Sequence, residues 1–246
     1  MKYLLLLAAL LAGCSSTQTI VSHQRPADRQ FIPEQTVLLQ DQKITLGVQN
    51  DQEFLYLQVT IPDRRKQRQI AFQGLTVWLD YRGGEERRFG IRYPLPGDHP
   101  FSGERPPEMG DTAALTPVTL SDDIEIIGPM AGEHHRVRMS ETHGIAVRLY
   151  NSDGLMRYLV TVPLSDNGEH IYGIGARPGS TIGLGIESGA FLSGGGIPGG
   201  RGGGPRMGGG GIGGGFGRRG GGRPPGEGES RPEPIKFWAK VQLSGV

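Results

Sequence analysis

The sequence contains one cysteine, Cys14, in 246 residues, so no disulfide can form within the chain. It also lacks an uninterrupted apolar run of the about 20 residues that a membrane-spanning helix needs. The formal net charge is only +1, and the length suits one domain of ordinary size, or one domain with a large insertion. The fold must therefore be stabilised by an apolar core.

Motifs of the common catalytic classes are also missing. The chain has no G-x-S-x-G, no H-E-x-x-H, no calcium-loop pattern and no paired cysteines. The glycines at 173–179 and 183–189 miss the dinucleotide-binding fingerprint by one residue, and no helical pattern follows them. These absences predict a protein that is not an enzyme and that has no cofactor.

One histidine-rich stretch resembles a metal site in composition only. Glu133, His134 and His135 are consecutive and His143 follows. Neighbouring residues of a strand point to opposite faces, so His134 and His135 cannot easily bind the same ion. We therefore predict a solvated hairpin here, and no metal site.

Three carboxylates precede an apolar pair at residues 126–127. Asp123 and Glu125 would share one face of a strand, with Asp122 before them. An acid and base in catalysis must face each other across a cleft, which positions this close in sequence do not demonstrate. A solvent-facing strand at a sheet edge is the favoured interpretation.

The first 13 residues have the pattern of a signal peptide. Lys2 supplies a positive charge, residues 4–11 form a short apolar core, and Ala12 and Gly13 are the small residues that precede a cleavage site. The stretch is too short to span a bilayer. We expect residues 1–13 to be removed from the mature protein.

Residues 11–14, Leu-Ala-Gly-Cys, resemble the lipobox of bacterial lipoproteins. That resemblance implies that Cys14 becomes the first mature residue and carries acyl chains that anchor it to a membrane. Ser15, by analogy with the same proteins, implies transport to the outer membrane of the cell envelope. We expect residues 14–35 to form a lipidated N-terminus and tether. The alternative is an ordinary secretory peptide in which Cys14 is incidental.

A glycine-rich segment interrupts the second half of the chain. Residues 194–226 include 20 glycines among 33 residues, together with five arginines and no acidic residue. So little apolar surface cannot offset the entropy of ordering the backbone, and 194–233 is predicted to be a disordered loop. It could be a spacer or could contact anionic envelope polymers. Nucleic-acid binding is not expected of an exported protein.

The rest of the chain alternates apolar and polar residues with a period of two. Residues 44–48 and 55–61 form one predicted hairpin around a turn at 50–51, and residues 75–79 and 89–93 form another around 82–84. Further strands are predicted at 137–139, 145–149, 158–164 and 237–243. This pattern predicts an all-β fold, an antiparallel β-sandwich of jelly-roll type formed by residues 36–193 and 234–246.

Five segments carry a family resemblance: "NDQEFLYLQVTIPD" at 50–63, "GLTVWLDY" at 74–81, "YLVTVPL" at 158–164, "STIGLGIESG" at 180–189 and "IKFWAKVQLS" at 235–244. Together they resemble the family-nine carbohydrate-binding modules and the related DOMON superfamily. The chain also resembles small bacterial envelope lipoproteins, in which phrases like "GLTVWLD" and a terminal "FWAKVQLS" recur. The resemblance implies a β-sandwich and a glycan as ligand. The late strand departs from the family pattern, because Val160-Thr161-Val162-Pro163 lacks the usual Glu.

Two sets of side chains could bind a ligand. Trp78, Trp238, Tyr56 and Tyr81 offer the flat faces on which sugar rings pack, although the two tryptophans lie in apolar strands and a position in the core is favoured for them. The basic residues Arg64, Arg65, Lys66 and Arg68 follow a strand end and are expected in an exposed loop, with contact to anionic glycans or lipid headgroups as the alternative.

These patterns favour a noncatalytic outer-membrane lipoprotein whose β-sandwich binds a ligand, with a glycan as the candidate, or serves as a scaffold. The competing hypotheses are a hydrolase of envelope polymers and an accessory subunit of an outer-membrane complex that contacts an envelope protein. The absence of a catalytic motif argues against the hydrolase.

Overall fold

The structure is a computed structural model that describes residues 17–27, 30–96, 121–128, 133–189 and 233–245. The predicted signal peptide 1–13, Cys14 and almost all of the predicted loop 194–233 lie outside the described residues. Within the described part of the chain, no helix has the length and apolar character needed to cross a membrane.

Strands make up most of the regular secondary structure of the described residues. The strands are β1 (Gln18–Val21), β2 (His23–Gln24), β3 (Thr36–Leu39), β4 (Ile44–Asn50), β5 (Phe54–Ile61), β6 (Leu75–Asp80), β7 (Phe89–Tyr93), β8 (Asp123–Ile127), β9 (His134–Arg138), β10 (Ala146–Ser152), β11 (Leu155–Pro163), β12 (Thr181–Ser188) and β13 (Lys236–Gln242). One α-helix, α1 (Arg64–Gln73), and two short 3-10 helices, η1 (Pro33–Gln35) and η2 (Met139–Glu141), accompany them.

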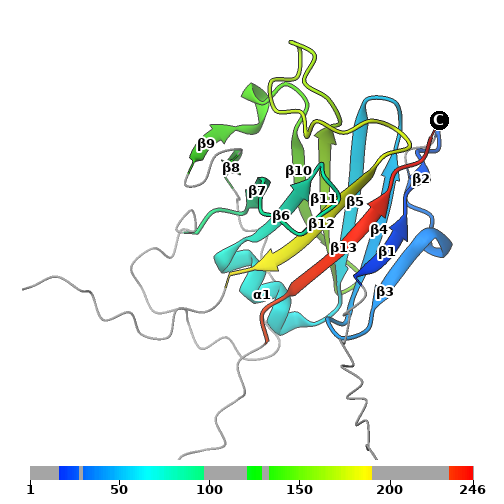
Figure 1. Ribbon diagram of the computed structural model, residues 1–246. Helices are drawn as coiled ribbons and strands as arrows, with labels where there is room; N and C mark the ends of the chain where they lie inside the picture. Colours follow the sequence, from blue (N-terminus) through cyan, green and yellow to red (C-terminus); the bar gives the residue numbers. More distant parts are fainter. Residues whose placement is uncertain (1–16, 28–29, 97–120, 129–132, 190–232, 246) are drawn as a thin grey trace, which may run out of the picture.

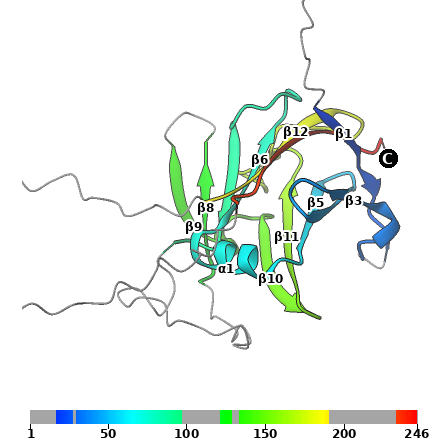
Figure 2. The same ribbon diagram turned by 90° about the horizontal axis from the view of Figure 1, so that it is seen from below.

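Two sheets pack face to face as the predicted sandwich (Figures 1 and 2). One sheet has the strand order β1-β13-β12-β6-β7-β8-β9, and the other has the order β10-β11-β5-β4-β2, with β3 also pairing with β4. Most neighbours are antiparallel, but β1 runs parallel to β13 and β2 runs parallel to β4, so both sheets are mixed. The predicted all-β sandwich is confirmed, with these two parallel pairings added.

The core lies between the sheets and follows the predicted alternation. In β5 every second side chain is fully buried, and the same alternation orients β4, β6 and β11. In the last strand the inward set consists of Ala239 and Val241, with Ile235 and Leu243 beside its ends and Phe237 partly buried. The strand after the glycine-rich segment is therefore an integral part of the sandwich.

The N-terminal boundary of the sandwich differs from the prediction. Residues 18–24, expected in the tether, add β1 to one sheet and β2 to the other. Ile20 is buried in the core, and the Ser22 hydroxyl donates a hydrogen bond of 2.7 Å to Asn50. The sandwich therefore begins well before residue 36.

The basic run at 64–68 forms α1 instead of the expected exposed loop. Asp63 caps the helix by accepting hydrogen bonds from the backbone N–H groups of Arg65 and Lys66 (2.7 and 3.1 Å), and Gly74 ends it with a φ of 79°. Ile70 anchors the helix in the core, where α1 contacts β5 and β12 and covers one end of the sandwich (Figure 2).

Candidate functional site

The two tryptophans face away from the core, contrary to the position favoured from the sequence. Strand pairing places Gly185 of β12 opposite both Trp78 of β6 and Trp238 of β13, and places Gly90 of β7 opposite Trp78. The outer face of the seven-stranded sheet thus carries a row in which tryptophan and glycine alternate across four strands. We call this surface the tryptophan face.

The two glycines let the indole rings lie against the sheet. A Cβ at Gly185 would lie 2.7 Å from Cε2 and Cζ2 of Trp238, and a Cβ at Gly90 would lie 2.6 Å from Cζ3 of Trp78. Both distances are shorter than carbon atoms tolerate, so only glycine fits beneath each ring. Sequence reasoning missed both glycines, although a glycine inside an alternating strand is a signal of close approach.

Glu187 connects Trp78 to the surface charges. The Trp78 Nε1–H donates a hydrogen bond of 3.1 Å to Oε2 of Glu187, while Oε1 of the same carboxylate accepts from Arg87 at 2.7 Å. The Arg87 guanidinium lies 5.8 Å from the Trp78 ring centroid. Trp78 is only 9% exposed, and Trp238 is more accessible.

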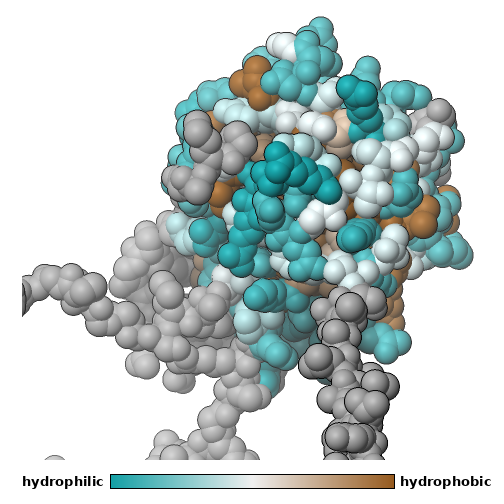
Figure 3. Space-filling model, in the orientation of Figure 1, coloured by the Kyte–Doolittle hydropathy of each residue, from teal (hydrophilic) through white to brown (hydrophobic). Residues whose placement is uncertain are grey.

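A groove of about 580 Å³ adjoins these side chains, lined by Glu85, Glu86, Arg87, Arg88, Glu187, Lys236 and Trp238. Positive and negative groups are mixed along it, which gives hydrogen-bond donors and acceptors with little net charge. Figure 3 views the molecule from the side on which β12 and β13 lie, and the described side chains there are mostly white to teal with a few separate brown ones.

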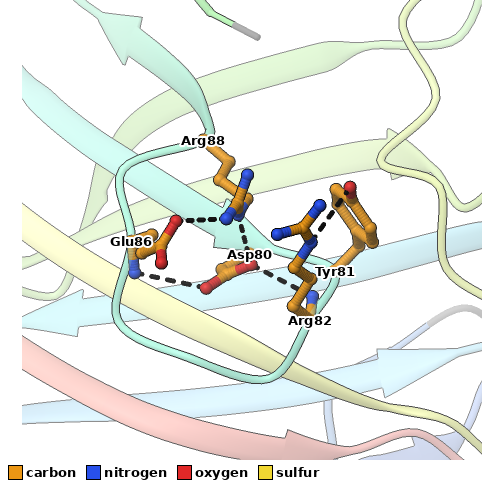
Figure 4. A network of polar contacts seen from close by, with 5 residues as sticks. All are labelled: Asp80, Tyr81, Arg82, Glu86 and Arg88. Atoms are coloured by element: carbon orange, nitrogen blue, oxygen red, sulfur yellow. Dashed lines mark hydrogen bonds and ion pairs between the residues drawn. The ribbon is translucent and has the colours of Figure 1, made fainter. Parts of the chain in front are cut away.

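A buried carboxylate fixes the turn that borders the groove (Figure 4). Asp80, at the end of β6, is 1% exposed and accepts hydrogen bonds from the backbone N–H groups of Arg82 and Glu86 (3.0 and 3.2 Å). Its Oδ1 lies 3.2 Å from Nε of Arg88, whose guanidinium also pairs with Glu86. The carboxylate thereby connects Arg82, Glu86 and Arg88 across the turn.

The two tyrosines predicted as ligand contacts lie apart from each other. Tyr81 follows Trp78 in the chain and is exposed beside the turn, with Arg82 and Arg88 near its ring (5.5 and 5.8 Å). Tyr56 lies on the outer face of the other sheet, beneath the guanidinium of Arg25 at 4.2 Å. Of the four aromatic residues, Trp78 and Trp238 share one cross-strand row on the outer face of the seven-stranded sheet, and Tyr81 lies in the turn after β6.

The basic residues of α1 do not form one contact surface. Arg64 and Arg65 are exposed and Arg68 is partly exposed, whereas Lys66 is buried and its Nζ donates a hydrogen bond of 2.6 Å to the Gln42 carbonyl. Burial lowers the pKa of the Lys66 ammonium, an effect that Asp63 partly opposes. Lys66 therefore joins the helix to the β3–β4 turn.

The carboxylate and histidine clusters are surface hydrogen-bond partners. Asp123 and Glu125 do share the outer face of β8, but β8 lies between β7 and β9 and is not the predicted sheet edge. Glu125 contacts His134 at 3.1 Å, and Glu133 contacts His135 at 3.0 Å. Among the described residues, no three His, Cys, Asp or Glu side chains come together in an arrangement that could hold a metal ion.

Comparison with known proteins gives a remote structural likeness and no match in sequence. The chain is similar to a crystal structure of a candidate carbohydrate-binding protein from Bacteroides uniformis, with a TM-score of 0.36 and 9% identity, over 70% of this chain and 84% of that chain. No protein-family model and no curated protein matches the sequence.

Proposed function

We propose that the protein is a noncatalytic glycan-binding lipoprotein of the outer membrane, anchored through Cys14, and that the tryptophan face contacts the sugar. The observation that carries this proposal is the Trp238–Gly185–Trp78–Gly90 row on the outer face of the sheet. Sugar rings pack their C–H faces on indole rings, while the ring hydroxyls need polar partners at the edge.

Trp238 is the ring that a sugar can reach, because Trp78 is only 9% exposed and does not line the groove. One strand lies between the strands of Trp78 and Trp238, so the two residues are separated by two strand spacings, about 9.6 Å. Trp238 is the more accessible ring and supplies the main stacking contact. Glu187, Arg87 and Lys236 adjoin it and can exchange hydrogen bonds with hydroxyl groups.

The mixed charges of the groove favour a neutral glycan. Arg87 and Glu187 already form an ion pair with each other. An acidic sugar would therefore compete with Glu187 for Arg87, and a basic sugar would compete with Arg87 for Glu187. Neutral hydroxyl groups can instead bridge the two charged side chains.

The test is a titration of the purified chain with neutral oligosaccharides of glucose and of N-acetylglucosamine. The chain has two tryptophans, so their fluorescence reports directly on the proposed contact. Trp238→Ala should weaken binding at least tenfold, as measured by calorimetry, whereas Leu38→Ala, at an exposed apolar residue on the other sheet, should leave it unchanged. Equal affinity of the parent chain and Trp238→Ala would rule out this surface.

A further inference from the structure

A second groove, of about 670 Å³, lies on the outer face of the six-stranded sheet. Its lining residues come from the segment that leads into β3 and from the outward positions of β3, β4, β5, β10 and β11: Arg25, Gln30, Phe31, Pro33, Thr36, Thr45, Gln58, Thr60, Tyr150, Arg157 and Leu159. We call it the arginine groove.

One wall of the arginine groove is held in place by contacts to the sheet. The Phe31 ring lies over Gly47, where a Cβ would come within 2.8 Å of Cδ1, so the ring rests on the β4 backbone. Arg25 lies 5.0 Å from the Phe31 ring centroid and donates a hydrogen bond of 2.8 Å to Gln49. Gln49 in turn donates to the Gln30 carbonyl at 3.1 Å, so this wall is preorganised.

The floor combines polar and apolar groups in cross-strand register. Arg157 of β11 pairs with Thr60 of β5 on one side and with Tyr150 of β10 on the other, while Leu159 pairs with Gln58. Tyr150 is 41% exposed, so its ring is available to a ligand. The groove therefore offers hydroxyl and amide groups beside the aromatic faces of Tyr150 and Phe31.

Its electrostatics differ from those of the tryptophan face. Among the described lining residues, arginine is the only charged type and no carboxylate is present. Arg148, exposed on β10, adds a third positive charge opposite Leu159. On the seven-stranded sheet, by contrast, Arg87, Arg92 and Arg136 each lie within 4 Å of a carboxylate.

We propose that the arginine groove binds an anionic saccharide, with the Arg157 guanidinium on its carboxylate or phosphate group and Tyr150 against its ring. A guanidinium presents paired N–H donors that match the two oxygens of either anion. Thr45, Thr60 and Gln58 lie where the sugar hydroxyls would be. This site is independent of the tryptophan face and would act whether or not that face binds a neutral glycan.

The shape of the groove favours a small saccharide over a membrane surface. A binding cavity for a small ligand typically has about 300–1,000 Å³, and this one falls in that range. Phe31 and Pro33 line the groove together with Arg157, so the guanidinium borders a concave surface. Anionic lipid headgroups are the competing ligand, and the experiment includes them.

The test measures binding of the full mature chain, by calorimetry and at two salt concentrations, to an acidic disaccharide that contains a uronic acid, to its neutral counterpart and to a sugar phosphate. The acidic disaccharide or the sugar phosphate should bind at least tenfold more tightly than the neutral sugar, and the difference should shrink at high salt. Which of the two binds more tightly identifies the anion. Arg157→Gln should abolish the preference, and Arg157→Lys should restore it only in part, because an ammonium lacks the paired donors.

Arg138→Gln is the matched control, since it makes the same substitution at an exposed arginine of the other sheet and should keep the preference for the anion. A loss of binding in Trp238→Ala with full binding in Arg157→Gln would overturn this proposal and support the tryptophan face alone. Equal affinity of the Trp238→Ala chain for the acidic and neutral sugars would also overturn it. The proposal would also be overturned if the chain bound vesicles that contain phosphatidylglycerol, lost that binding in Arg157→Gln, and bound neither anionic sugar.

Discussion

The Trp238 indole lies against the backbone of Gly185, its direct neighbour across β13 and β12. A Cβ built on Gly185 would come within 3 Å of three ring atoms of Trp238. The ring position is therefore set by the absence of a side chain on the adjacent strand.

Gly185→Ala should displace Trp238 and lower the free energy of unfolding by about 1–3 kcal/mol, as other overpacked sites do. Chemical denaturation measures this change. In a Trp238→Ala background the same substitution should cost much less, because the atoms that the new Cβ meets are gone. Equal costs in the two backgrounds would show that the ring does not lie over Gly185.

Asp80→Ala should destabilise the fold by about 1.5–3 kcal/mol, because it removes the buried carboxylate that accepts hydrogen bonds from Arg82 and Glu86, while Arg88 keeps its ion pair with Glu86. It should also weaken ligand binding at the tryptophan face, because the turn that Asp80 fixes carries Arg87 and Arg88 of the groove. Thermal unfolding measures the first effect and calorimetry the second. Asp41→Ala, at an exposed aspartate, is the control and should change stability by no more than about 0.5 kcal/mol. Similar losses in the two variants would argue against a special role for Asp80.

Tyr158 should make the protein less stable in alkali. Its side chain is fully buried and its hydroxyl donates to the Leu75 carbonyl at 3.2 Å, and burial raises its pKa well above that of a free tyrosine. Above a pH of about 10, the unfolded chain releases the Tyr158 proton while the folded chain keeps it, so the free energy of unfolding falls as the pH rises.

Tyr158→Phe removes this linkage. It should cost about 0.5–1.5 kcal/mol at neutral pH through the lost hydrogen bond, yet give a shallower decline above a pH of about 10. Burial also raises the pKa of Tyr93, which leaves part of the decline in place. Denaturant titrations from pH 7 to 11 provide the measurement. Parallel curves for the parent and the variant would show that Tyr158 does not cause the decline.

Cys14→Ala should prevent attachment of lipid, since no thioether can form before cleavage of the signal peptide. Metabolic labelling with an alkynyl fatty acid should label the parent chain and not the variant, and the variant should remain unprocessed or be found in the wrong compartment. Labelling of both to the same extent would contradict the lipoprotein assignment.

The alternation of apolar residues predicted most strands correctly because the sandwich buries one face of each strand. The same alternation predicts the orientation of the tryptophans. Because Val77 and Leu79 point inward, Trp78 between them points outward. Because Ala239 and Val241 point inward, Trp238 also points outward. Their large apolar rings favoured a core position. Both rings lie outside the space between the sheets, yet Trp78 is buried at 9% exposure and Trp238 is partly buried. The alternating pattern predicts the face on which a side chain lies, and contacts on that face decide how deeply it is buried.

Other features depend on contacts that local patterns do not contain. The tryptophan face requires β12 to lie between β6 and β13, and β6 is separated from β12 by about a hundred residues of sequence. The parallel pairing of β1 with β13 joins the two ends of the described chain. Helix α1 was missed because its apolar residues are few, although Asp63 and Gly74 are a capping residue and a helix-ending glycine of the usual kinds.

The last strand should be indispensable, although it follows a long glycine-rich segment. β13 pairs with β12 on one side and β1 on the other, so a chain that ends at Arg231 would expose the backbone of both neighbours. It would also remove Val241 and Leu243 from the core, at about 1.5–3 kcal/mol each, together with Ile235 and Ala239.

That loss is comparable with the whole stability of a typical domain, so the truncated chain should aggregate. Deleting 194–226 and joining its ends with a short linker is the matched control and should preserve the melting temperature to within a few degrees, because loop length changes stability only slowly. Limited proteolysis with trypsin provides a second measurement: after cleavage between Arg201 and Arg223, the fragment that carries β13 should remain bound to the rest of the protein during gel filtration. Separation of that fragment without denaturant would show that β13 contributes too little to hold the sheet together, and it would remove Trp238 from the proposed glycan site.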